Sequence, residues 1–187
     1  MRILAISGSL RRGSHNRALL EAAAVAPPPG VTLEVWEGLG ALPIYDEDLD
    51  GDLAPAPVTE LRRVIAEADA VLIATPEYNA SIPGGLKNAL DWASRPFQTN
   101  VLRGKPAAVV GASTGIFGAV WAQAETRKVL KTIGAAVLED ELPVGMAPDA
   151  FAADGRLVDP DLHGRLEAIV AGLVTAAGGV RDAELAA

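Results

Sequence analysis

The sequence predicts an α/β fold, in which a doubly wound, five-stranded parallel sheet carries helices on both faces. Short apolar runs alternate along the chain with longer segments of helical period, which is the pattern of repeated strand–helix–strand units. The 187 residues suit one domain spanning residues 1–187, and 50% of them are hydrophobic, which is enough for a substantial core. We expect the strand order 2-1-3-4-5, one of the two common orders of doubly wound sheets.

Five short runs of aliphatic residues are the expected strands: Arg2–Ser7, Thr32–Trp36, Ala70–Thr75, Lys105–Gly111 and Ala135–Leu138. The segments between them place apolar residues on one side of a helix, as Val58, Leu61 and Ile65 do. The expected helices are Arg17–Ala26, Val58–Ala68, Gly85–Ala93, Ala119–Ile133 and Asp161–Thr175. We expect the last residues, Gly178–Ala187, to fray.

Composition excludes several classes of function. The chain has no cysteine, so it forms no disulfide, thiolate nucleophile or cysteine metal site, and its two histidines leave little for a histidine metal cage. Its 24 acidic and 16 basic residues give a net charge of −8, the wrong sign for gripping nucleic acid. No apolar run approaches a membrane span, and the first apolar stretch is too brief for a signal peptide, so we expect a cytoplasmic protein.

The expected topology selects three loops as the ligand site. In a doubly wound sheet, ligands lie outside the carboxyl ends of the strands, at the point where the strand order reverses. The first loop, Gly8–Asn16, the second loop, Pro76–Gly84, and the third loop, Ala112–Gly118, follow the three strands that meet there. We therefore look for binding chemistry in these loops.

The first loop leads from a buried strand into a helix and suits a phosphate. Free backbone N–H groups at the helix start, short polar side chains and Arg11 would together hold a dianion, while Arg12 is expected to be merely solvated. The spacing nearly fits an ATP-binding loop, but Ser14 occupies the lysine position and His15 the hydroxyl position, which disfavours triphosphate hydrolysis. An ordinary polar turn with a helix cap at Ser14 or Asn16 is the simpler alternative.

The second loop carries two prolines and a glycine pair, which fix a rigid course before the next helix. Tyr78 offers an aromatic body and Asn79 both a donor and an acceptor, which together suit the edge of a planar heterocycle. The alternative is that both residues merely close the turn. On the following helix, we expect Asn88 and Trp92 to serve packing and subunit contacts.

The third loop offers small residues whose N–H groups can approach a ligand closely. It also contains Ser113 in a Gly-x-Ser-x-Gly pattern, with Asp140 and His163 following in the order that α/β-hydrolases require. Against a hydrolase, no His-Gly-Gly oxyanion loop is present and His163 begins a helix. A serine hydrolase using Ser113, Asp140 and His163 stays open as an alternative.

The segment Asp46–Gly51 copies the first six positions of a calcium-binding loop. The twelfth position, however, is Pro57 where such a loop needs a bidentate glutamate. We therefore expect an acidic surface loop near the cofactor or a subunit contact.

Two long motifs carry a resemblance to a known family. They are Gly8-Ser9-x-Arg11-x-x-Ser14-x-Asn16 and Pro76-Glu77-Tyr78-Asn79-x-Ser81-x-Pro83-Gly84-x-Leu86-Lys87-Asn88-Ala89-Leu90-Asp91-Trp92, supported by Gly111-Ala112-Ser113 and Pro43-x-Tyr45-Asp46-x-Asp48. With them, the chain resembles the NADPH-dependent FMN reductase family over residues 2 to about 140. These are flavodoxin-like flavoproteins that include bacterial quinone, chromate and azo-dye reductases.

The resemblance implies FMN as cofactor, NADPH or NADH as hydride donor, and a small-molecule electron acceptor served in a ping-pong scheme. It also implies a homodimer, often paired into a tetramer, and no catalytic side chain because the flavin carries the chemistry. By this likeness the phosphate of FMN would meet Ser9, Leu10, Arg11, Ser14, His15 and Asn16. The ring would run beside Pro76, Glu77, Tyr78 and Asn79. The pyrimidine end would face Ser113, Thr114 and Gly115. Backbone N–H groups of the third set would stabilise negative charge on reduced flavin.

The chain departs from the family pattern in the third loop and the helix after it. Ala119 replaces a glycine that many relatives carry, and Trp121 and Ala124 replace polar groups found in some. An apolar rim there favours quinones or aromatic nitro and azo compounds over chromate. A flavin electron carrier that uses no nicotinamide is the remaining alternative.

Overall fold

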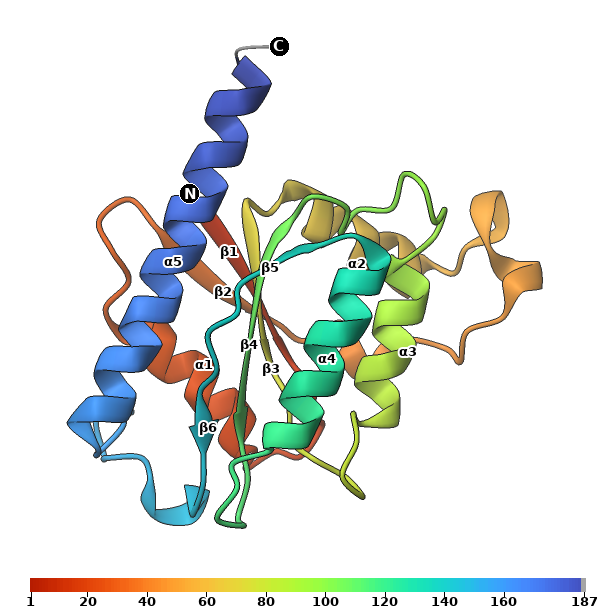
Figure 1. Cartoon of the computed structure of the whole chain (residues 1–187). Coiled ribbons are helices and arrows are strands. Elements are labelled where there is room, and N and C mark those ends of the chain that lie inside the picture. The colour runs from red at the N-terminus through yellow and green to blue at the C-terminus, as the bar shows by residue number, and fades with distance from the viewer. Residues whose placement is uncertain (186–187) are drawn as a thin grey trace.

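The computed structural model describes residues 1–185, and it confirms the predicted sheet (Figure 1). The strands lie in the order β2-β1-β3-β4-β5, and every neighbouring pair is parallel. Their bounds are β1 Arg2–Ser7, β2 Thr32–Trp36, β3 Ala70–Ala74, β4 Pro106–Ala112 and β5 Ala136–Val137. The order reverses between β1 and β3, which makes the carboxyl ends of these strands the expected ligand edge.

A sixth strand, β6 (Pro143–Val144), was not predicted. It pairs with the end of β4, at Gly111 and Ala112, whereas β5 pairs with the beginning of β4. Strand β3 occupies one edge of β4. Strands β5 and β6 therefore both lie along the opposite edge of β4, one after the other. Two residues are too few to produce a periodic signal. The consequence for function is that β6 brings new backbone against the third loop.

The helices form two layers, one on each face of the sheet (Figure 1). The first layer is α1 (His15–Val25) with α5 (Pro160–Leu185); the second is α2 (Ala56–Glu67), α3 (Gly84–Ala93) and α4 (Val120–Ile133). Residues of β1 alternate between the two hydrophobic cores, with Ile3 in one and Leu4 in the other. Burial of both faces explains why the strands read as continuous apolar runs.

Two helix bounds differ instructively from the sequence prediction. Helix α1 begins at His15 because Ser14 caps it, its Oγ accepting from the Arg17 N–H at 3.2 Å. Helix α5 runs through Leu185, well into the stretch expected to fray, and Ala177, just before that stretch, is buried against the core. Residues 186–187 of that stretch lie outside the described residues.

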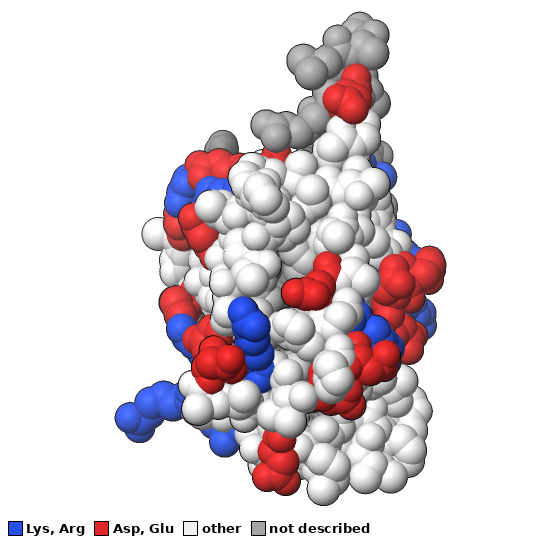
Figure 2. Space-filling view, turned by 90° about the vertical axis from the view of Figure 1, so that its left-hand side faces the viewer, with Lys and Arg blue, Asp and Glu red and all other residues white. Residues whose placement is uncertain are grey.

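The surface gives two further facts. Within residues 1–185, no helix combines the length and apolar character that crossing a membrane requires. Figure 2 shows the face on the left of Figure 1, where basic side chains lie close to acidic ones and wide uncharged areas separate the groups. Among the coloured residues of this face, no continuous basic surface is formed.

Candidate functional site

A pocket of about 420 Å³ lies at the carboxyl ends of β1, β3 and β4, and we call it the switch-point pocket. All three predicted loops contribute to its walls. The lining residues are Ser9, Arg11, Ser14, His15, Asn16, Pro76, Glu77, Tyr78, Ala112, Ser113, Thr114 and Pro148. Of the residues that the sequence predicted, Leu10, Asn79 and Gly115 are not in the wall. Pro148, which belongs to a short turn after β6, was missed because no local motif marks it.

The first loop presents hydrogen-bond donors that the fold leaves unused. The first N–H groups of a helix have no acceptor within it, and at α1 only that of Arg17 is satisfied, by Ser14. The N–H groups of His15 and Asn16 therefore stay available at the positive end of the helix dipole. Within residues 1–185, no carboxylate pairs with the Arg11 guanidinium. This donor set fits a phosphate.

Asn16 has a different role from the one that the sequence suggested. Its side chain is only 3% exposed, its Oδ1 accepts from the Ala112 N–H at 2.9 Å, and its Nδ2 donates to the Ala112 carbonyl at 2.9 Å. Both polar atoms are thus engaged with the end of β4. Asn16 ties the first loop to the third, and so shapes the pocket by positioning it.

His15 lies in the wall as a neutral side chain. Its ring stacks on Phe151, with the centroids 6.5 Å apart and the planes 3° from parallel. Burial lowers the pKa of His15 below its ordinary value of 6.5, and the positive charge of Arg11 lowers it further. This environment favours the neutral imidazole, and the fixed positive charge that the first loop brings to this pocket is that of Arg11.

The second loop contains a tight two-residue turn. Tyr78 and Ser81 exchange two backbone hydrogen bonds of 3.1 Å, and the residues between them, Asn79 and Ala80, have φ of +54° and +58°. Both angles lie in the left-handed region, as a type I′ turn requires. Tyr78 is 53% exposed and lines the pocket, whereas Asn79 lies at the turn itself.

Two carboxylates join the second loop to α4. Glu77 Oε2 accepts from the N–H groups of Trp121 at 3.0 Å and Ala122 at 3.1 Å. It thereby caps a helix whose own N-cap, Ala119, has no acceptor side chain. In return, Glu125 Oε2 accepts from the Ser81 hydroxyl at 2.7 Å. Glu77, predicted from the sequence as a ligand residue, thus also has a structural role.

Ala119 explains one departure from the family pattern. Its φ is +61°, in the left-handed region, where a glycine is least strained. The glycine that many relatives carry there is therefore the conformationally natural residue, and this chain tolerates an alanine in its place. The alanine side chain is 1% exposed, so it is packed rather than presented to a ligand.

The third loop is held by β6. The Ser113 N–H donates to the Val144 carbonyl at 3.0 Å, and this corrects the expectation that it would face the flavin. The N–H groups of Thr114 and Gly115 donate to no acceptor within residues 1–185. The approach is so close that a Cβ on Gly145 would lie 2.4 Å from the Ile116 carbonyl oxygen. Only a glycine lets these two segments meet.

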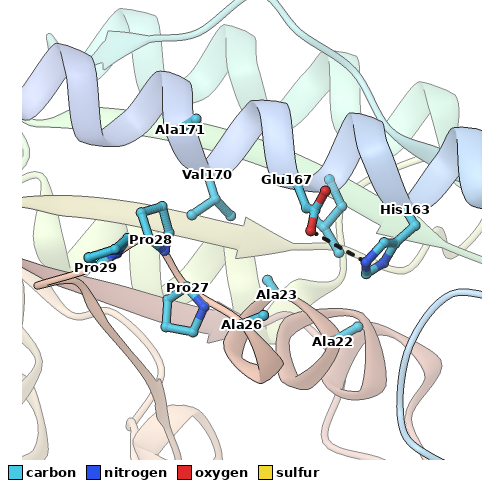
Figure 3. A pocket seen from close by; sticks show the side chains of 11 residues that line it. Ala22, Ala23, Ala26, Pro27, Pro28, Pro29, His163, Glu167, Val170 and Ala171 are labelled. Atoms are coloured by element: carbon cyan, nitrogen blue, oxygen red, sulfur yellow. Dashed lines mark ion pairs between the residues drawn. The ribbon is translucent and has the colours of Figure 1, made fainter.

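The hydrolase alternative fails on geometry. The Ser113 hydroxyl donates to the Gly115 carbonyl at 3.2 Å, and Asp140 lies in the connection between β5 and β6. His163 lies in another pocket, of about 360 Å³ between α1 and α5, which we call the helix pocket (Figure 3). There its Nε2 is 3.5 Å from Glu167 Oε1. The three residues therefore form no triad.

Helix α3 confirms the packing role expected of its motif. Asn88 Oδ1 accepts from the Tyr45 N–H at 2.8 Å, while Asn88 Nδ2 and Trp92 Nε1 both donate to the Pro43 carbonyl, at 2.9 and 2.8 Å. The Tyr45 ring also meets Trp92 edge-on, with centroids 4.8 Å apart. The Pro43-x-Tyr45 motif and the α3 motif are thus two halves of one contact.

The calcium-like segment serves an ion pair. Asp50 lies 2.7 Å from the Arg62 guanidinium, in a partly buried pair. Burial by itself raises the pKa of Asp50, but the hydrogen bonds from Arg62 and the Gly51 N–H, with the positive charges of Arg62 and Arg95, together bring the pKa below its ordinary value. Part of the acidic segment therefore ties the connection before α2 to α2 itself.

Comparison with known proteins identifies relatives of this chain. The family model of NADPH-dependent FMN reductases matches residues 1–149. An NAD(P)H-dependent FMN reductase of Pseudomonas aeruginosa is 45% identical over 160 residues, which are 85% of each chain. A 2-hydroxy-1,4-benzoquinone reductase of Burkholderia is 38% identical over 168 residues, 89% of this chain and 91% of the other.

A solved structure extends the agreement to the fold. The flavoenzyme NAD(P)H:(acceptor) oxidoreductase of Paracoccus denitrificans superimposes with a TM-score of 0.83 at 36% identity, covering 95% of this chain and 97% of its own. These similarities overturn the hydrolase and electron-carrier alternatives. The chain belongs to the NADPH-dependent FMN reductase family, and it is an oxidoreductase with FMN as cofactor and NAD(P)H as hydride donor.

Proposed function

We propose that the switch-point pocket binds FMN, with the phosphate on the first loop, the ring beside the second and the pyrimidine end toward the third. The observation that supports this most is the set of unused donors on the first loop, which includes the Arg11 guanidinium. Direct contacts are assigned to Ser9, Arg11, Ser14, His15, Pro76, Tyr78, Thr114 and Gly115, and positioning roles to Asn16, Glu77 and Ser113. Leu10, Asn79 and Gly115 lie outside the wall, and Gly115 is assigned a contact only through its free backbone N–H.

The chemistry supplied by bound FMN is hydride acceptance from NAD(P)H, followed by reduction of an acceptor in the same place, a ping-pong scheme. The protein orients the reactants and stabilises charge. The free N–H groups of Thr114 and Gly115 would offset negative charge at the pyrimidine end, each by about 1.5–3 kcal/mol when the acceptor atom is charged. Tyr78 would provide an aromatic wall.

Two spectra test this assignment. The purified protein should absorb in the visible range, and rapid mixing with NADPH should bleach that absorption. A colourless protein that gains no colour with added FMN would contradict the cofactor site. Flavin that stays oxidised after NADPH is added would contradict the reductase assignment.

We further propose that the acceptor is an uncharged aromatic molecule such as a quinone, or an aromatic nitro or azo compound. The third loop and α4 present Phe117 and Trp121 in edge-on contact at 5.1 Å, 57% and 50% exposed. The nearby carboxylates are Glu77 and Glu125, which repel an oxyanion. The relative from Burkholderia is named a 2-hydroxy-1,4-benzoquinone reductase, and the relative from Pseudomonas putida is named a quinone reductase. Faster turnover of chromate than of benzoquinone would contradict this proposal.

We also propose a homodimer, which can pair into a tetramer. Apolar side chains stand exposed on the second loop, the third loop and the start of α4, and a second copy would cover them: Tyr78, Ile116, Phe117 and Trp121. Sedimentation of the holoenzyme at micromolar concentration should give a dimer or larger mass, and a monomer would contradict it. We propose as well that residues 1–187 form one domain. We propose that this domain acts in the cytoplasm, and cell fractionation tests its location.

A further inference from the structure

A second pocket lies against the first loop. It has a volume of about 410 Å³ and shares Ser9 and Arg11 with the switch-point pocket, so the two are neighbours across that loop. Its other walls include Arg12 and residues at the end of β2 and just after it, above all Trp36. We call it the Trp36 pocket. Apart from the shared Ser9 and Arg11, neither the family motifs nor the proposed FMN contacts account for its walls.

Its basic side chains are unusual in this acidic chain. Most arginines within residues 1–185 are engaged, as Arg17 is with Glu21 at 2.8 Å and Glu37 at 2.5 Å. Arg11 and Arg12, adjacent in sequence and both exposed, pair with no carboxylate of the described residues. Two unpaired guanidinium groups at one opening, in a chain of net charge −8, mark a place for an anion.

Part of the remaining wall is apolar, and it lies beside the Arg17–Glu37 ion pair, which also lines the pocket. Trp36 lies so close over Gly38 that a Cβ there would be 2.3 Å from the indole Cζ2, and Leu10 and Leu39 also line the pocket. Leu10 is 66% exposed, an apolar side chain that the core does not use. An aromatic face beside aliphatic side chains suits a planar heterocycle. The pocket thus joins a heterocycle surface to a phosphate-binding edge.

We propose that the Trp36 pocket binds the adenosine 2′-phosphate half of NADPH, with the 2′-phosphate on Arg12 and the adenine against Trp36. The proposal rests on the proposed function, in which the nicotinamide half enters the neighbouring switch-point pocket. A planar guanidinium matches phosphate geometry with two parallel hydrogen bonds. NADPH and NADH differ by this phosphate alone, so Arg12 would set the preference between them.

The test uses the holoenzyme and an Arg12→Ala variant. The ratio of KM for NADPH to KM for NADH should rise about tenfold, as expected for loss of a charge-assisted contact at an exposed site. Calorimetry should show a similar weakening for adenosine 2′,5′-bisphosphate, but not for adenosine 5′-monophosphate, which lacks the 2′-phosphate. Arg156→Ala removes the same charge from an exposed site outside the pocket and should leave the KM ratio unchanged.

Two outcomes would overturn the inference. One is a KM ratio that stays the same in Arg12→Ala and Arg156→Ala; the other is an equal loss of affinity for the bisphosphate and the monophosphate. In either case, flavin that NADPH still bleaches would leave the proposed function standing. Flavin that neither nicotinamide bleaches would instead count against the proposed function itself.

Discussion

The switch-point pocket and the helix pocket are close in volume, about 420 and 360 Å³, yet they differ in what their walls offer. Each contains one of the two histidines of the chain, His15 in the first and His163 in the second. The helix pocket is walled mainly by small and apolar side chains of α1, α5 and the Pro27–Pro29 segment (Figure 3). The switch-point pocket is walled by loops that carry hydroxyl, amide and guanidinium groups.

The difference shows that several unpartnered donors gathered at one place, rather than volume or a single unpaired atom, identify the ligand site. In the helix pocket, His163 Nε2 meets Glu167, and one buried atom, His163 Nδ1, has no partner within residues 1–185. In the switch-point pocket, Arg11 and the first N–H groups of α1 remain unused after the fold is complete. Buried or half-buried donors of this kind are costly unless a ligand or water meets them. The following predictions test this contrast, beginning with the largest effect.

The double substitution Ser14→Ala, Asn16→Ala should weaken FMN binding about 100-fold. The first change removes the α1 cap and a pocket hydroxyl; the second breaks both hydrogen bonds to Ala112, so the first and third loops lose their register. Together these losses amount to roughly 2.7 kcal/mol of binding free energy. Fluorescence titration of the apoprotein with FMN measures the dissociation constant.

The matched control places a double substitution in the helix pocket, His163→Gln with Glu167→Ala. Both side chains lie on α5 and line that pocket, away from the three loops. FMN affinity should then stay within about twofold of the wild type, because surface changes away from the site are usually small. Equal losses in the two double variants would remove the distinction between the pockets.

Removing the Glu77 carboxylate should destabilise the fold by about 1–2 kcal/mol, the usual range for a lost helix cap. In Glu77→Ala, two N–H groups at the start of α4 lose their acceptor, and Ala119 offers no substitute. Urea denaturation of the apoprotein measures the free energy of unfolding. Glu125→Ala removes a hydroxyl contact and one long contact of 3.4 Å from the Ile82 N–H, and neither caps a helix start, so its loss should be smaller. A Glu77→Ala loss no larger than that of Glu125→Ala would contradict the capping role.

Sequence reasoning found the topology and the three loops because both follow from patterns that span many residues. Alternating apolar runs specify a parallel sheet, and the sheet order in turn selects the loops at the reversal. What it missed depends on contacts between distant residues. β6 is two residues long, Asn16 meets Ala112 across 96 positions, and Glu77 caps α4 across 44 and 45. No local pattern reveals that a side chain in a motif is already engaged elsewhere.

Relieving the backbone strain at Ala80 in the second loop should stabilise the protein slightly. Ala80 is exposed and has φ of +58°, a conformation that costs an alanine roughly 1 kcal/mol and a glycine little. Glycine also loses more entropy on folding, and this loss offsets part of the gain. Ala80→Gly should therefore raise the free energy of unfolding by about 0.5 kcal/mol. Thermal unfolding of the apoprotein checks the direction, and a lower melting temperature would contradict it.

The smallest expected effect distinguishes the two histidines by pH. The pKa of folded His15 lies below its ordinary value of 6.5, so below about pH 6.5 the unfolded chain binds a proton that the folded chain resists. The contribution of His15 to stability is therefore complete above that pH and declines as the pH falls. Comparing His163→Gln with the His15→Gln, His163→Gln double variant in urea, from pH 7.5 to 5.5, isolates this slope. If both variants lose stability equally as the pH falls, His15 is not held neutral in the switch-point pocket. In that case it would join Arg11 as a positive charge available to the phosphate.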